Sequence, residues 1–187
     1  MSLKTPVGML MFEHLFVARP VVAGGEPRFN FVLLLDEAAQ KTPEYKALRA
    51  ACAEAVDAEF GKGKAADASF MRSLRTPFRP AAEKDKYTGF TAGKVFIAPW
   101  TKTKPGIVDG NLQEITAPRD VWAGQLCRAT VQPFAYHQGG NKGVAFMLNN
   151  IQITKADMPR MDGRKNAAED FDPVDGTPSN AADDSPF

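Results

Sequence analysis

Cysteine and histidine are scarce in this sequence. Its 187 residues include two cysteines, Cys52 and Cys127, and two histidines, His14 and His137. The cysteines are too few and too far apart for a disulfide framework or a zinc site, and neither histidine has a cysteine or a carboxylate cluster near it in the sequence. We therefore expect no metal, no cofactor and no enzymatic activity. The cysteine usage is typical of a reducing compartment, and we expect a cytoplasmic protein.

Long hydrophobic runs are also lacking. The apolar stretch from Gly8 to Phe12 is followed at once by Glu13 and His14, so it is too short for a signal sequence or a membrane span. Hydrophobic residues make up 44% of the chain and charged residues 24%, which is close to the average for soluble globular domains. These values indicate one domain with a real core and no membrane association.

Basic residues are absent after Lys165. Residues 167–187 contain six carboxylate side chains and no Lys or Arg, so this segment carries a charge of −6. Residues 1–166 hold all 23 basic residues and the other 16 acidic ones, which gives +7. A basic body joined to an acidic tail favours a polyanionic partner and a tail that competes for the same surface. We expect a folded domain over residues 1–166 and a disordered tail over residues 167–187.

The apolar pattern predicts a mainly β fold, a small β-barrel with one long inserted α-helix. The helix is predicted over Pro43–Phe60, with Thr42 as its N-cap and Gly61 as its terminator. Residues 61–93 lack a regular pattern and are expected to form a long loop. Short runs rich in β-branched and aromatic residues predict the strands, at Met9–Val17, Arg28–Leu35, Phe90–Trp100, Trp122–Tyr136 and Val144–Ile153.

Alternation along the later strands separates two faces. Small residues such as Cys127 and Ala129 suit the interior of a narrow barrel, whereas the opposite face carries rings and cations. Rings interleaved with Lys and Arg are the ingredients of a groove for single-stranded nucleic acid, because bases stack on rings while cations contact phosphates. The candidates, together with those of the loop and the hairpin, are Arg75, Phe78, Arg79, Lys86, Tyr87, Lys94, Phe96, Trp100, Lys102, Lys104, Arg128, Phe134, Tyr136 and Lys142.

Other interpretations of these residues remain open. Phe96, Trp100 and Phe134 could instead cover a second small core under the loop, and any single cation could be ordinary solvated surface. At the level of function, the alternatives are a β-barrel that binds proteins through its outer rings and a small nucleotide hydrolase. The acidic tail argues against the hydrolase, because it would repel a triphosphate.

The chain ends in a compact docking element. An aromatic side chain beside the terminal carboxylate and two aspartates would fit an apolar pocket with a basic rim; its residues are Asp183, Asp184, Pro186 and Phe187. This ending resembles the acidic tip of bacterial single-stranded DNA-binding proteins. That resemblance implies recruitment of replication and recombination proteins through the tail.

The order of segments over roughly residues 4–172 resembles a family of single-stranded DNA-binding proteins from tailed phages and prophages. The resemblance is carried by the segments Phe12–Phe16, Leu74–Arg79, Pro105–Asp109, Gly124–Tyr136 and Gly140–Gln152. It implies an OB-fold barrel that coats and protects single-stranded DNA without sequence preference, in phage replication or recombination inside the bacterial host cell. A homodimer is left open.

Overall fold

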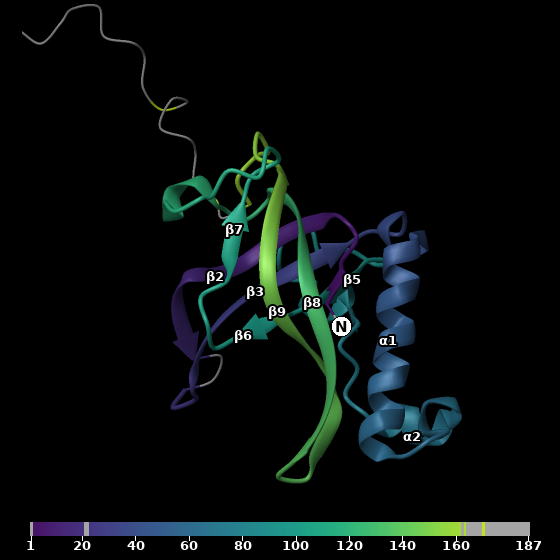
Figure 1. The fold of residues 1–187 in the computed structure, drawn as a ribbon. Coiled ribbons are helices and arrows are strands. Elements are labelled where there is room, and N and C mark those ends of the chain that lie inside the picture. The colour runs from purple at the N-terminus through teal and green to yellow at the C-terminus, as the bar shows by residue number, and fades with distance from the viewer. Residues whose placement is uncertain (1, 21–22, 162, 164–169, 171–187) are drawn as a thin grey trace, which may run out of the picture.

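A computed structural model describes residues 2–20, 23–161, 163 and 170. In this part of the chain nine strands form one sheet (Figure 1). The strands are β1 (Leu3–Lys4), β2 (Gly8–Pro20), β3 (Pro27–Leu35), β4 (Arg79–Pro80), β5 (Val95–Ile97), β6 (Trp100–Thr101), β7 (Gly106–Val108), β8 (Leu126–Gln138) and β9 (Asn141–Lys155). The α-helices are α1 (Pro43–Phe60) and α2 (Ala68–Ser73), and the 3₁₀ turns are Ala39–Lys41, Lys64–Ala66, Ala81–Lys84 and Pro118–Asp120.

Five of these strands close into a barrel. They follow the order β8-β2-β3-β6-β9, and β9 pairs again with β8 to complete the ring. The β6–β9 pair is parallel, and the other pairs of the ring are antiparallel. At the chain start, β1 adds to β8 and pairs Leu3 with Val131. A closed barrel of five strands is the OB-like architecture that the sequence predicted.

The barrel has an inner core and a second apolar cluster on its outside. Odd-numbered residues of β3, such as Phe31 and Leu33, are buried in the main core, whereas Val32 and Leu34 belong to the outer cluster. Cys52 and Cys127 are both buried in the main core. Because burial disfavours the thiolate, it raises the pKa of Cys52 to about 12 and raises the pKa of Cys127 as well. Both thiols are therefore held in the neutral, unreactive form.

Helix α1 begins and ends where the sequence predicted. The Thr42 hydroxyl accepts a hydrogen bond from the Tyr45 backbone N–H, and Pro43 occupies the first turn. The helix ends at Gly61, whose φ of 106° lies in a region that favours glycine. Its buried residues include Leu48 and Val56, and Figure 1 shows the helix lying along β8. No helix in the described segments is long and apolar enough to cross a membrane.

The segment between α1 and β6 differs from the prediction in two ways. Residues 61–93 contain α2 and two 3₁₀ turns rather than a plain loop, and the carboxylate of Asp67 caps α2 by accepting from the backbone N–H groups of Ser69 and Phe70. The predicted strand Phe90–Trp100 is reduced to β5 and β6. Gly93, with φ of 83°, makes a turn before β5, and Pro99 interrupts the ladder after it because proline has no N–H to donate.

Candidate nucleic-acid interface

Three predicted rings lie together on the outside of the barrel. Trp100 on β6 and Phe134 on β8 meet edge to face with 5.8 Å between ring centroids, and Phe134 lies 6.4 Å from Tyr136. We call these three residues the ring strip. All three are half-buried. The structure thus brings together aromatic candidates that are far apart in the sequence, on the two strands that flank β9.

Strand β9 runs beneath the ring strip and supplies the space for it. Phe134 pairs with Ala145 and Tyr136 pairs with Gly143, so each ring lies opposite a small residue. A Cβ atom at Gly143 would approach the Tyr136 hydroxyl oxygen to 2.8 Å. Met147 continues the same face, pairs with Trp100 and is exposed. Between Gly143 and Met147 the outer face of β9 therefore carries small or apolar side chains next to the rings.

Arg28 is a member of this surface that the sequence analysis missed. Its guanidinium carbon lies 3.7 Å from the Trp100 ring centroid, a cation–π contact. The signal was present in β3, where Arg28 and Asn30 have the same parity as the outward-facing Val32. Asn30 pairs with both Trp100 and His14, so these three form one row across the barrel. Burial and, next, the charge of Arg19 lower the pKa of His14, which favours its neutral ring.

Two predicted cations lie at the hairpin end of the strip. The Arg75 backbone N–H donates to Lys142 O at 3.0 Å, and Arg75 O accepts from Val144 N at 3.0 Å. Arg75 is therefore fixed beside the edge of β9, and its side chain is exposed. The Lys142 ammonium lies 4.8 Å from the Phe70 ring centroid on α2. The turn between β8 and β9 consists of Gly139 and Gly140, both with positive φ, which suits a two-residue hairpin.

Other predicted cations have partners within the protein. Lys102 donates to Glu26 Oε1 at 2.8 Å, and this hydrogen bond, with the lysine charge, lowers the pKa of Glu26. Both side chains are exposed, so the pair is weak. The Arg128 Nε–H donates to Gln152 Oε1 at 2.8 Å on the outer face of β8 and β9. The Lys104 ammonium lies 5.5 Å from the Phe16 ring centroid.

Phe96 corrects one of the stacking predictions. Its side chain is 0% exposed and packs edge to face against Phe90 in the outer cluster at 5.8 Å. For this residue the alternative of a second small core was right, because the segment between β4 and β5 covers it. Lys94 also contributes to this covering segment, because its ammonium donates a hydrogen bond to Gly89 O at 2.9 Å. Arg79 forms an ion pair with Glu83.

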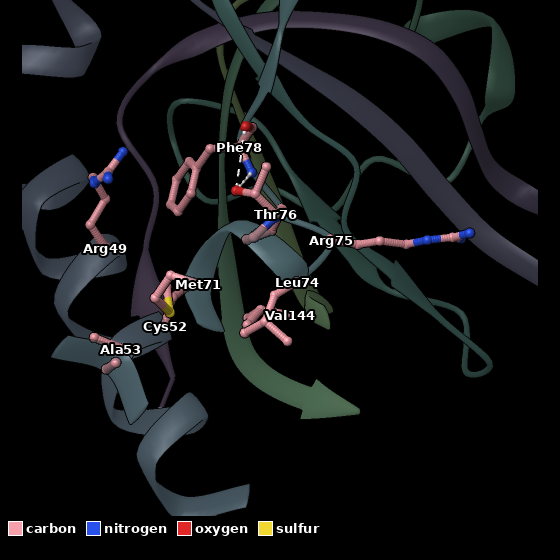
Figure 2. A pocket seen from close by; sticks show the side chains of 11 residues that line it. Arg49, Cys52, Ala53, Met71, Leu74, Arg75, Thr76, Phe78 and Val144 are labelled. Atoms are coloured by element: carbon pink, nitrogen blue, oxygen red, sulfur yellow. Dashed lines mark hydrogen bonds between the residues drawn. The ribbon is translucent and has the colours of Figure 1, made fainter. Parts of the chain in front are cut away.

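Phe78 lies away from the ring strip and lines a separate pocket. The pocket has a volume of about 220 Å³ and lies between α1 and the segment after α2 (Figure 2). The Phe78 ring contacts Tyr45 at 5.1 Å and the buried Phe146 at 5.6 Å, which is a packing role. Figure 2 shows the Arg75 side chain directed away from this pocket. The remaining loop candidates, Lys86 and Tyr87, are exposed beside the outer cluster.

A closed five-stranded barrel with rings and cations on its outer face defines a protein of the class that binds single-stranded nucleic acid. The profile of a family described as Enterobacter phage Enc34 single-stranded DNA-binding protein matches residues 1–185. The chain belongs to this family, which confirms the resemblance seen in the sequence. The family is defined by DNA binding and not by a reaction. The tail residues Asp183, Asp184, Pro186 and Phe187 lie outside the described residues.

Solved structures of phage proteins share the fold. The single-stranded DNA-binding protein from bacteriophage Enc34, in complex with single-stranded DNA, superposes with a TM-score of 0.69 at 16% identity, covering 84% of this chain and 88% of that one. Another structure of the Enc34 protein gives 0.63 at 16% identity, with 91% and 90% covered. The single-stranded DNA-binding protein gp2.5 of bacteriophage T7 gives 0.54 at 11% identity, with 88% and 97% covered. Comparison with curated protein sequences gives no match.

Proposed function

We propose that this protein coats single-stranded DNA during phage DNA replication or recombination, without reading the base sequence. The observation that carries the proposal is the ring strip, three half-buried rings on one outer face of a closed barrel. Every base has a π-face, so stacking on Trp100, Phe134 and Tyr136 tolerates any sequence. Arg28 and Arg75 lie at opposite ends of this strip and would contact the phosphates.

Binding should depend strongly on salt, because phosphate contacts release counterions. If about five phosphates are neutralised, the logarithm of the affinity falls with the logarithm of the salt concentration with a slope near −3.5. The measurement is a titration of labelled single-stranded DNA at several salt concentrations, with duplex DNA and RNA of equal length as comparisons. Arg75→Gln should make the slope shallower by about 0.7, whereas Lys46→Gln on the exposed side of α1 should leave it unchanged. A flat salt response would rule out the proposed phosphate contacts.

For the acidic tail we propose two roles, recruitment of replication or recombination proteins and competition with DNA for the basic surface. Removal of residues 167–187 takes away six carboxylates, so it should tighten DNA binding at low salt and abolish recruitment. At high salt the gain should vanish, because screening removes the competition. Deletion of Phe187 alone is the matched control, since it keeps all six side-chain charges. If the full and truncated chains bind DNA with equal affinity at every salt concentration, the tail does not compete with DNA for the basic surface.

A barrel that binds proteins through its rings is the second candidate function, favoured by the exposed Met147 beside the strip. It predicts no quenching of Trp100 fluorescence by oligonucleotides, whereas stacking predicts quenching. Nucleotide turnover with magnesium tests the hydrolase alternative. We propose that the protein has no enzymatic activity and acts in the cytoplasm of the bacterial host. The mass of the protein in solution tests whether it forms a homodimer.

A further inference from the structure

Phe12 adopts a backbone conformation that aromatic residues rarely take. Its φ is 49°, in the left-handed region, where a bulky side chain costs stability. It lies in a bulge of β2, because Met11 pairs with Val32 and His14 pairs with Asn30, so that two residues of β2 oppose one of β3. Glycine is the usual residue at the left-handed position of such a bulge. The backbone geometry alone therefore does not explain why a phenylalanine occupies this position.

The bulge holds the Phe12 ring on the outside of the barrel. Phe12 packs against the outer cluster rather than the main core. Its ring meets Tyr87 edge to face with 4.9 Å between centroids, and it lies 5.8 Å from Phe90. Phe90 is buried, but Phe12 is half-buried and Tyr87 is 39% exposed. Phe12 and Tyr87 thus form a ring pair at the surface of the cluster.

Two lysines flank this ring pair. The Lys84 ammonium lies 5.1 Å from the Phe12 ring centroid and 5.6 Å from that of Tyr87, and the Lys86 ammonium lies 5.2 Å from Tyr87. The ion pairs of the described chain involve neither lysine. Neither ammonium therefore has a salt-bridge partner among the described residues. Phe12 and Tyr87 with their adjacent lysines thus combine rings and cations as the ring strip does, although other segments of the chain supply them.

The ring pair lies on the same side of the sheet as Trp100, a short distance away. Trp100, Asn30 and His14 form one row, and Phe12 is two residues from His14 along β2. Two strand spacings and a rise of two residues place the Cα atoms of Phe12 and Trp100 roughly 12 Å apart. This is a span of about three stacked nucleotides. A DNA strand leaving the ring strip past Trp100 could reach Phe12 without leaving the barrel surface.

We propose that Phe12, Tyr87, Lys84 and Lys86 form a second stacking site, which extends the path of single-stranded DNA past Trp100. The inference rests on the proposed function, and it adds that the affinity depends on the length of the oligonucleotide. Short oligonucleotides occupy the ring strip alone, and longer ones engage both sites. The strained bulge keeps an aromatic ring at the surface where the path continues.

The test compares oligothymidylates of about 4 and about 12 nucleotides, a short and a long ligand within the usual range of OB-fold site sizes. Tyr87→Ala removes an exposed ring, and Phe12→Gly removes the strained ring while suiting the positive φ. Each should weaken binding of the long oligonucleotide by about 5- to 150-fold, the loss expected for one stacked base, and leave the short one unchanged. Trp100→Ala should weaken both. The readout is the anisotropy of the labelled oligonucleotide, and thermal unfolding checks that each variant is folded.

The outcomes separate the two proposals. If Tyr87→Ala and Phe12→Gly bind the long oligonucleotide as the unmodified protein does, the second site is wrong while the proposed function stands. If they weaken both lengths equally, these rings do not form a separate site, and the inference also fails. If the unmodified protein binds neither length, the proposed function itself is wrong. A double Lys84→Gln, Lys86→Gln variant should in addition make the salt slope for the long oligonucleotide shallower by about 1.4.

Discussion

Replacing Trp100 and Phe134 with alanine together is expected to weaken single-stranded DNA binding more than any other pair of substitutions. Stacking contributes about 1–3 kcal/mol per base, so the double variant should lose about 2–6 kcal/mol. The two rings touch, with 5.8 Å between centroids, so the combined loss should differ from the sum of the single losses. Both side chains are half-buried, and the fold should survive. A fluorescence or anisotropy titration at fixed salt measures the loss.

The matched control for this experiment is Trp122→Phe. Trp122 lies outside the ring strip, and its indole N–H donates to Met158 O at 3.1 Å. DNA affinity should therefore be unchanged, and the fluorescence of the remaining Trp100 can be followed alone. Full DNA affinity in the Trp100→Ala, Phe134→Ala variant, with a normal unfolding curve, would refute the ring strip as the binding surface.

A large loss of stability is expected for Phe146→Ala. The Phe146 side chain is 1% exposed and its ring contacts Phe78 at 5.6 Å, so it joins the barrel core to the segment beneath α1. Deleting such a ring leaves a cavity and lowers the free energy of unfolding by about 3–5 kcal/mol. That is a large fraction of the roughly 5–15 kcal/mol that stabilises a typical domain. Urea unfolding followed by circular dichroism gives the difference.

Met147, the next residue along β9, provides a control because its side chain is exposed instead of buried. Met147 points to the outer face and is 43% exposed, so Met147→Ala should change the free energy of unfolding by less than about 1 kcal/mol. A similar loss of stability in both variants would mean that the assignment of inner and outer faces along β9 is wrong. Because Met147 pairs with Trp100, its replacement should show more clearly in DNA binding than in stability.

The sequence predicted those features that depend on neighbouring residues. Thr42, Pro43 and Gly61 mark the ends of α1 because capping acts within one turn. Alternation separated Cys127 and Ala129 from the outer face of β8, since it follows from strand geometry alone. These local rules located the helix and most of the barrel strands.

What the sequence could not predict depends on segments that are distant along the chain. Alternation placed Phe96 on the outside correctly, but it carries no information about what covers that outside. The covering residues Ala81 and Phe90 come from a segment without periodicity. Arg28 was missed for a similar reason, because its significance arises only when β3 and β6 bring it over Trp100. Each of these positions is determined by tertiary pairing.

The pairing of β1 with β8 has a consequence for how the protein is made. Leu3 pairs with Val131, and the ring closes only when β9 has paired with β8. When only the N-terminal half of the chain has left the ribosome, that half exposes strands with open edges and apolar faces. Contacts this distant in sequence slow folding, so the chain must complete its barrel after most of it has been synthesised. The surface formed by β6, β8 and β9 can therefore assemble only after β9 has been synthesised.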